Sequence, residues 1–286
     1  MALTGEGGGR TLAELRAEID RIDAAMHGLL IERSAVIDEL ISVKGTTAPG
    51  AAFRPAREAD MIRRLAARHR GALPLATAEH IWRVIIATFT HMQSAFEVVF
   101  DGSGDAEAMR DLARFQFGFD VTLTRLPDAA AVIETVATTG AALGLVGAGG
   151  PYREGAWWRA LAGATRPKIM AAIPFIRRGA EPPRPLAFVV FPRLADPPVA
   201  DLRLVAARST GEAGAAGRFF GEALLLAWQQ GAETELLLGV EGEDDTTLAK
   251  RAAAAGLPLG DLADVGAIAK GVVIDGPAGL LYQSAG

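Results

Sequence analysis

Three basic residues near the N-terminus, Arg16, Arg33 and Lys44, have types and spacings that suit an anion-binding site. Arg33 takes the next position of an apolar helix seam that runs through Leu29, where a buried unpaired charge would be costly. Lys44 follows 11 residues later, which at ~100° per residue returns to within ~20° of the same face. Arg16 lies 17 residues before Arg33, on another face, from which it suits a pocket of a partner chain. Either Arg33 reaches solvent or pairs with Glu32, or the seam opens there into an anion pocket.

Two further helices are expected to carry polar groups on their apolar faces. Glu58, with Arg57 beside it, lies on the face of a helix that begins near Pro55, and Gln93 lies in a helix from about Ala76 to Phe96. The apolar stripe of that third helix is expected to consist of Ile81, Ile85, Phe89 and Phe96. Glu58 alone would suit a helix N-terminus, and Gln93 alone could be satisfied by backbone. Because buried polar groups need partners, their recurrence across three helices favours a polyanionic ligand with an additional hydroxyl or ether oxygen.

A single long helix has to position the three basic residues. We expect it to run from Thr11 to Lys44, 34 residues or about 50 Å, with Thr11 and Glu14 as a capping box and Gly45 at its end. Its seam consists of apolar residues at alternating spacings of three and four: Leu12, Leu15, Ile19, Ile22, Met26, Leu29, Val36, Leu40 and Val43. The rest of a 97-residue helical segment cannot cover a helix of that length, so we expect a homodimer through this helix.

Composition and charge exclude several classes of protein. The chain has 286 residues, of which 50% are hydrophobic and 22% charged, and these values are typical of a globular protein. The net charge of −5 argues against a nucleic-acid binder, which needs a basic excess or a basic face. No apolar run approaches the ~20 residues of a membrane span, and residues 1–10 lack the apolar core of a signal peptide. We therefore expect a cytoplasmic protein without membrane partners.

Neither a metal nor a cofactor is expected. The chain has no cysteine, and its four histidines lack the spacing of metal ligands. The Gly102-Ser103-Gly104 loop follows a predicted strand but lacks the third glycine of a dinucleotide-binding motif. Asp101 and Asp105 flank that loop and would repel phosphates.

A series of motifs gives the first part of the chain a family resemblance. They are Leu15-Arg16, Ile19-Asp20, Ile22-Asp23, Leu29-Leu30, Glu32-Arg33 and Val43-Lys44, then Arg54-Pro55-Ala56-Arg57-Glu58, then Ile85-Ile86 with Gln93. From Leu12 to about Phe96 the chain thus resembles the all-helical chorismate mutases. The resemblance implies an intertwined homodimer and an isomerase that converts chorismate to prephenate. That reaction belongs to the shikimate pathway and leads to phenylalanine and tyrosine.

The resemblance also implies roles for individual residues. Arg33 and Arg57 would hold the substrate around its carboxylates, and Arg16 would be contributed by the other subunit. Glu58 would bind the ring hydroxyl.

Lys44 and Gln93 would both contact the ether oxygen. Chorismate rearranges in one unimolecular step without proton transfer, so no nucleophile or general base is required. The protein helps by holding the reactive conformation and by aiming donors at the oxygen on which negative charge grows.

Two positions depart from the family pattern. Arg54 stands where many relatives carry an Asp that helps to bind the hydroxyl, and Phe89 stands where a small polar residue is common. Isochorismate pyruvate lyase therefore stays open as an alternative activity. A bifunctional mutase and dehydratase, or a catalytically silent dimer that senses aromatic amino acids, are further alternatives.

After Phe96 the periodicity changes, and the second part predicts an α/β domain. The expected limits are 1–10 for a flexible tail, 11–97 for the helical domain and 98–286 for the α/β domain. The expected strands are Val98–Phe100, Val121–Leu123, Leu143–Val146, Ile169–Phe175, Leu186–Phe191, Leu202–Ala207, Glu233–Val240 and Ala267–Ile274. The expected helices are Ala106–Phe115, Ala129–Ala137, Gly217–Gln229 and Thr246–Ala255. The opening β-α-β-α-β order indicates a parallel or mixed sheet, so the fold class is α + α/β.

A second set of motifs runs from residue 97 to about 192. It consists of Leu112-Ala113-Arg114-Phe115 through Gly118, Ala130 with Val132-Ile133, Leu143-Gly144-Leu145-Val146, and Lys168-Ile169. These residues resemble the prephenate dehydratase domain that often follows a chorismate mutase domain. That family works with a Thr-Arg-Phe motif, and the corresponding place here reads Leu186-Ala187-Phe188. We infer a dehydratase-like domain that has lost dehydratase chemistry and serves a regulatory or structural role.

Overall fold

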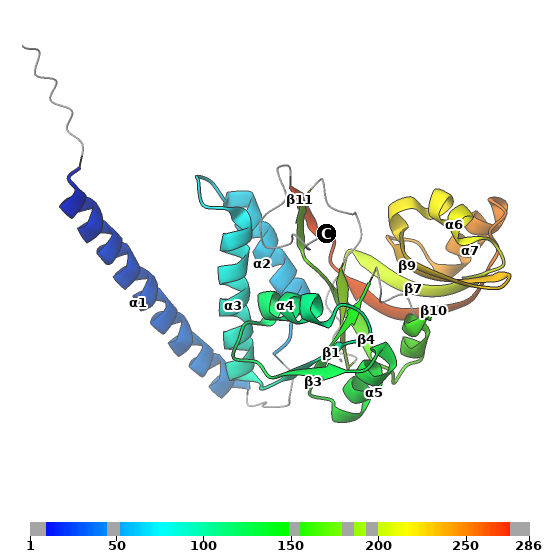
Figure 1. Ribbon diagram of the computed structural model, residues 1–286, viewed down its shortest axis with the longest axis horizontal. Coiled ribbons are helices and arrows are strands. Elements are labelled where there is room, and N and C mark those ends of the chain that lie inside the picture. Colours follow the sequence, from blue (N-terminus) through cyan, green and yellow to red (C-terminus); the bar gives the residue numbers. More distant parts are fainter. Residues whose placement is uncertain (1–9, 45–51, 149–154, 179–185, 193–199, 275–286) are drawn as a thin grey trace, which may run out of the picture. The chain divides into compact units, whose positions relative to one another are not determined.

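The structure is a computed structural model that describes residues 10–44, 52–148, 155–178, 186–192 and 200–274. The chain divides into two compact units, Met1–Thr47 and Ala48–Gly286. Among the described residues, the first unit contains one helix, and the second contains the other helices and the strands (Figure 1). Two predicted features fall outside the described residues: the tail up to residue 9 and the helix end at Gly45.

The first unit is the predicted long helix, α1, which spans Leu12–Lys44. Its capping box is present, because the Thr11 backbone N–H donates to Glu14 Oε2 (2.7 Å) and the Glu14 N–H donates to Thr11 Oγ1 (3.2 Å). The apolar seam is largely exposed in the single chain, with exposed fractions of 64% at Leu12, 64% at Leu29 and 85% at Val43. Among the described residues no helix is both long and apolar enough to cross a membrane.

The second unit begins with a helical hairpin, α2 (Pro55–Arg68) and α3 (Leu75–Gln93). α2 starts at the predicted proline. α3 ends three residues before the predicted Phe96, because Ser94 is extended (φ −160°, ψ 106°) and the chain turns into the first strand.

The predicted stripe of α3 is partly wrong. Phe89 is buried, but Ile81 is 38% exposed and Ile85 is only half-buried. The buried face consists of Ala78, Glu79, Arg83, Ile86, Ala87, Phe89 and Thr90. The reason is that α3 packs on α2 and also on the first helix of the α/β part.

The α/β part opens with three parallel strands and two crossover helices. In chain order they are β1 (Glu97–Asp101), α4 (Ala106–Phe117), β2 (Leu123–Leu126), α5 (Ala129–Thr139) and β3 (Ala142–Gly147). The spatial order is β2-β1-β3. Asp105 and Asp128 cap the two helices by accepting the N–H groups of Ala108 and Ala131. β2 begins two residues later than predicted. Before it, the Thr122 carbonyl accepts the Val98 N–H at 2.9 Å, and the regular pairing with β1 starts at Leu123.

The next segment adds a 3₁₀ helix and three strands. They are η2 (Trp157–Leu161), β4 (Lys168–Ile173), β5 (Ile176–Arg178) and β6 (Ala187–Phe191). β6 runs antiparallel between β3 and β4, so the sheet is mixed, as the sequence allowed. Its side chains alternate between two apolar cores, with Ala187 in one and Phe188 in the other. β6 therefore presents no polar side chain where the dehydratase motif would stand.

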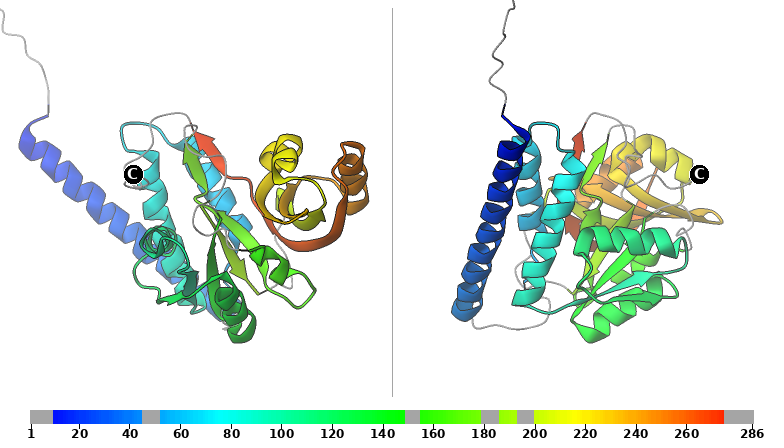
Figure 2. Two further views of the ribbon diagram at one scale, coloured as in Figure 1. Left: turned by 45° about the vertical axis from the view of Figure 1, so that its right-hand side comes forward. Right: turned by 60° about the vertical axis from the view of Figure 1, so that its left-hand side comes forward.

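The remaining elements form a β-α-β-β-α-β unit. They are β7 (Leu202–Ser209), α6 (Ala213–Phe220), η3 (Gly221–Ala223), β8 (Leu224–Gln230), β9 (Glu233–Val240), α7 (Asp245–Ala254) and β10 (Leu259–Ile268). Their strands are ordered β10-β7-β9-β8 and are antiparallel. Figure 2 shows this unit in yellow to orange-red. This is the split βαβ arrangement of ferredoxin-like folds.

Two element predictions in this unit are wrong. The predicted helix Gly217–Gln229 contains the end of α6 and the strand β8, which is held by pairing with β9. The predicted strand Ala267–Ile274 covers the end of β10, residues 269–271, which are not in a strand, and β11 (Val272–Ile274). β11 pairs with β5 in a separate two-stranded sheet.

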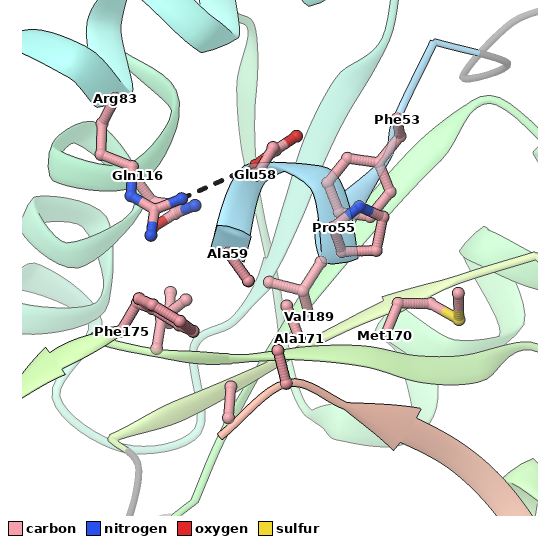
Figure 3. A pocket seen from close by; sticks show the side chains of 13 residues that line it. Phe53, Pro55, Glu58, Ala59, Arg83, Gln116, Met170, Ala171, Phe175 and Val189 are labelled. Atoms are coloured by element: carbon pink, nitrogen blue, oxygen red, sulfur yellow. Dashed lines mark ion pairs between the residues drawn. The ribbon is translucent and has the colours of Figure 1, made fainter. Parts of the chain in front are cut away.

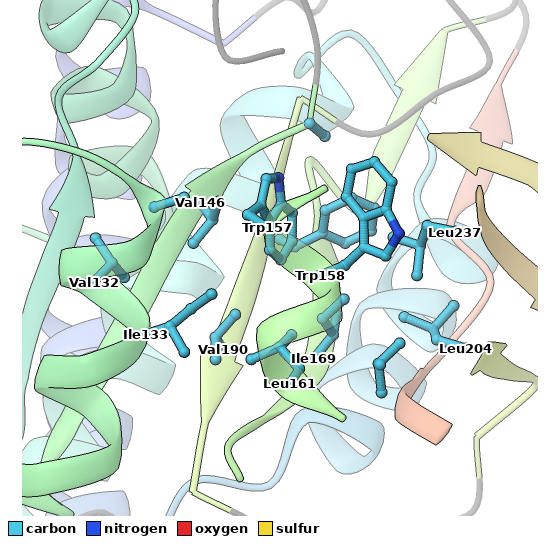
Figure 4. Close-up of a cluster of buried hydrophobic side chains, with 14 of the residues drawn as sticks. Val132, Ile133, Val146, Trp157, Trp158, Leu161, Ile169, Val190, Leu204 and Leu237 are labelled. Atoms are coloured by element: carbon cyan, nitrogen blue, oxygen red, sulfur yellow. The ribbon is translucent and has the colours of Figure 1, made fainter. Parts of the chain in front are cut away.

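Two tryptophans join the two halves of the α/β part. Trp157 and Trp158 stand edge to face with ring centroids 5.9 Å apart, beside α5 and the central strands (Figure 4). Trp158 also donates its indole N–H to the Leu236 carbonyl on β9 at 3.1 Å. One core therefore continues from the parallel strands into the ferredoxin-like unit.

The sheet is continuous across these halves only through β4 and β10, which meet where Gly266 pairs with Ile169. Gly266 has φ +143°, and a Cβ there would clash with the Ile169 carbonyl oxygen. Only glycine fits this conformation and this approach.

Gly266→Ala is therefore expected to destabilise the protein by about 3 kcal/mol or more, through backbone strain and the clash with β4. Gly260→Ala on the same strand is the matched control, because a Cβ there meets nothing within 4 Å. Urea denaturation of both variants measures the difference. A Gly266→Ala midpoint equal to that of the control would show that β4 and β10 are not joined in this way.

Candidate active site

The six predicted site residues are distributed over both units. Arg16, Arg33 and Lys44 lie on α1, where Arg16 is exposed and Arg33 half-buried, and the Lys44 side chain lies outside the described residues. The other three, Arg57, Glu58 and Gln93, lie on the α2–α3 hairpin of the second unit.

On the hairpin the three residues differ in their surroundings. Arg57 is exposed, Gln93 is half-buried, and the Glu58 side chain is only 13% exposed. Arg54, which precedes the helix, is exposed, and Phe89 is buried. Glu58 is therefore the member of the set whose environment the structure defines most fully.

Gln93 has a fixed amide orientation. Its Nε2 donates to the Phe89 carbonyl at 2.9 Å, one helical turn earlier. Because only the nitrogen can donate to a carbonyl, this contact identifies the NH₂ group and holds it at the end of α3. One N–H is occupied, and the second remains available to an acceptor.

Glu58 belongs to a buried cluster of three charged side chains. Arg83 Nη1 stands 3.6 Å from Glu58 Oε2 (Figure 3). Arg83 Nε stands 3.5 Å from Glu79 Oε1. The side chains of Arg83 and Glu79 are 4% and 3% exposed. Two carboxylates thus share one guanidinium out of water, where unbalanced charge is expensive.

The cluster shifts the titration of both acids. Burial raises the pKa of the Glu58 carboxyl above its usual 4.5, and the Arg83 charge partly opposes that rise. Burial likewise raises the pKa of Glu79, against the opposing effects of Arg83 and of a hydrogen bond from the Ile176 backbone N–H. Both acids therefore favour the protonated form more than they would in water.

The cluster faces a hollow between the hairpin and the sheet. The hollow is small, with room for about one water molecule, and Glu58, Arg83 and Gln116 form its polar corner (Figure 3). Gln116 is 6% exposed, and no side-chain hydrogen bond to it is present among the described residues. The remaining walls are apolar and consist of Phe53, Pro55, Ala59, Met170, Ala171, Ala172, Ile173, Phe175, Val189 and Ala269. Arg57 and Gln93 are not among the lining residues.

No group of three potential metal ligands occurs among the described residues. The cluster of Glu58, Glu79 and Arg83 includes a cation and only two carboxylates, which suits ion pairing.

Sequence reasoning missed Arg83, Glu79 and Gln116. The signal for the first two was present, because Glu79, Arg83, Ile86 and Thr90 follow the 4-3-4 spacing of a helix face. A Glu and an Arg four residues apart usually form an exposed helical pair, so their types alone do not indicate burial. Nothing in the sequence marked Gln116.

The helical part of the chain matches a known protein family. Residues 15–94 match the family model of chorismate mutase type II. That part of the chain is therefore a chorismate mutase family domain, and it gives the chain an isomerase activity. All six predicted site residues lie inside the matched segment.

No curated protein sequence matches the chain. A solved structure described as "GqqA- a novel type of quorum quenching acylases" aligns with 66% of this chain and 98% of its own length, at 15% identity and a TM-score of 0.36. Similarity at that level supports no conclusion about function.

The raised pKa of Glu79 predicts a pH-dependent stability difference. In the unfolded chain this carboxyl ionises near pH 4.5, whereas the folded state resists ionisation, so the wild type loses stability as the pH rises above that value. Glu79→Gln keeps the shape and removes this penalty. The free energy of unfolding of Glu79→Gln relative to wild type is therefore expected to increase from about pH 4.5 upwards and then level off.

Urea titrations of both proteins at a series of pH values measure this difference. Glu107→Gln, on α4, is the control because Glu107 is exposed. A relative stability of Glu79→Gln that is constant with pH would contradict the cluster.

Proposed function

We propose that the protein is a chorismate mutase that rearranges chorismate to prephenate in aromatic amino acid biosynthesis. The observation that carries the proposal is the family match over residues 15–94, which includes all six proposed site residues. No proton transfer or covalent intermediate is needed, so the task of the site is to bind a dianion in its reactive shape.

The proposed role of each residue follows from the chemistry of its side chain. Arg33 and Arg57 bind the substrate carboxylates, since a guanidinium offers a planar fork that matches a carboxylate. Arg16 is supplied by the second subunit. Glu58 accepts the hydrogen bond of the ring hydroxyl, and its ionised carboxylate is the stronger acceptor for that bond.

Lys44 and Gln93 act on the ether oxygen, where negative charge grows as the C–O bond breaks. Lys44 supplies a full charge. For Gln93 the structure supports the role, because the contact to the Phe89 carbonyl leaves its second N–H as a donor of fixed orientation.

A homodimer through α1 is part of the proposal. The seam of α1 exposes large apolar side chains along its length: Leu12, Leu15, Ile19, Ile22, Met26, Leu29 and Val36. Exposed apolar surface of this extent needs a partner, and a second copy of α1 offers the same heptad spacing.

The α/β part, about 98–286, is proposed to be regulatory or structural and related to prephenate dehydratase domains. Two observations support this proposal. β6 carries apolar residues where the dehydratase motif would be, and a ferredoxin-like unit follows it.

The proposed reaction is tested by incubating the purified protein with chorismate and identifying the product by chromatography. Prephenate is expected. Lys44→Ala and Gln93→Ala should each lower kcat by about 10²–10³-fold, the usual effect of removing one donor to a developing anion. Lys250→Ala and Gln230→Ala, at exposed positions of the α/β part, are the matched controls. Release of pyruvate instead would favour the lyase, and wild-type protein without turnover would overturn the proposal.

The dimer is tested by subunit complementation. Arg16→Ala and Lys44→Ala homodimers are each expected to be nearly inactive. Because Arg16 is proposed to act in the partner's site, subunit exchange should create heterodimers with one intact site, and a mixture should recover about a quarter of wild-type activity. No recovery after exchange, confirmed by mass spectrometry of differently tagged subunits, would place Arg16 in its own subunit's site.

A further inference from the structure

Arg83 is the charged partner of Glu58 in the described part of the chain. From α3 it approaches Glu58 to 3.6 Å, and Glu79 on the same helix is the second charged group of the cluster. From the other elements around Glu58, α4 contributes the neutral Gln116, while β4 and β6 contribute apolar residues such as Met170. The charge state of Glu58 therefore depends on how Arg83 is shared.

The sharing is a competition between two acids. Arg83 stands 3.6 Å from one carboxylate and 3.5 Å from the other, and all three side chains are nearly removed from water. At such distances a buried carboxylate without a cation is expected to take up a proton. Loss of Arg83 would leave two buried acids, and loss of the Glu79 charge would leave one matched pair.

The position of Arg83 is fixed from the α/β side as well as from the hairpin. Its guanidinium lies 5.9 Å from the centre of the Phe175 ring, just after β4. Glu79, its second partner, accepts the backbone N–H of Ile176. Phe175 and Ile176 also pack into the apolar core of the hairpin with Ile62.

We propose that Arg83 is a positioning residue of the mutase site: it keeps Glu58 ionised and oriented to accept the substrate hydroxyl, and Glu79 and the segment after β4 hold Arg83 in place. The inference rests on the proposed mutase function. It adds to that function a residue that does not touch substrate and a dependence on the α/β part.

The test uses the full-length protein and four variants. Arg83→Gln should lower kcat/KM roughly tenfold or more near pH ~6, with the loss shrinking as the pH rises, because Glu58 is protonated at higher pH than in wild type. Glu79→Gln should move the acid limb of the profile the opposite way, to lower pH. Arg83→Lys keeps the charge, so the acid limb of its kcat/KM profile should lie close to that of the wild type. Arg64→Gln, which removes an exposed guanidinium from the same hairpin, should leave the profile unchanged.

A second readout does not depend on turnover. Carboxyl ¹³C NMR of glutamate-labelled protein, with the Glu58 signal assigned through Glu58→Gln, follows its titration directly. The expected result is an upward shift of the Glu58 midpoint in Arg83→Gln and a downward shift in Glu79→Gln, since a merely structural role would not give shifts of opposite sign.

Each outcome decides one point. NMR midpoints that do not move in opposite directions overturn the inference, whatever the enzyme does. Midpoints that move without a matching change in the kinetic acid limb also overturn it, because Glu58 then does not act on the substrate. Wild-type protein that does not turn over chorismate counts against the proposed function. The NMR titrations still test the effect of Arg83 on Glu58 in that case.

Discussion

One buried guanidinium connects the helical hairpin to the α/β part. Arg83 lies between Glu58 and Glu79, and Glu79 in turn accepts a hydrogen bond from the strand side at Ile176. A buried cluster of two carboxylates and one guanidinium adds little net stability to a core, because apolar residues of the same volume usually stabilise it as well. Its presence beside a residue proposed to bind substrate is better understood through the charge state that it sets on Glu58.

A second cation fastens the same hairpin at another place. Arg63 on α2 pairs with Asp201 and donates to the Lys270 carbonyl, and its guanidinium lies 5.6 Å from the centre of the Phe175 ring. Although burial opposes ionisation, the hydrogen bond from Arg63 and that from the Lys270 N–H lower the pKa of Asp201. Unlike the Glu58 cluster, this pair is about one-third exposed, so solvent screens it and its share of the attachment is smaller.

Much of the helical part was readable from the sequence, because its signals are local. Thr11 with Glu14 and Pro55 mark helix starts that depend on neighbouring residues only. The strands β8 and β10 were not readable in the same way. β8 has an apolar run, Leu224–Ala227, that fits a helix equally well, and it becomes a strand by pairing with β9. β10 contains Gly260 and Gly266, which weaken an isolated strand pattern, yet Gly266 is what allows β10 to approach β4.

The candidate site shows the same limit more sharply. The residues of the family motifs could be named from the chain, but Arg83 and Glu79 looked like an ordinary exposed pair until α4 and the segment after β4 covered them. Burial, which only the tertiary structure supplies, changes their role from surface charges to partners that set a pKa. β4 then relates the proposed regulatory unit to the site. It pairs with β10 at Ile169 and leads directly into Phe175 and Ile176. The ferredoxin-like unit is thus connected through β4 to the residues that pack on Arg83.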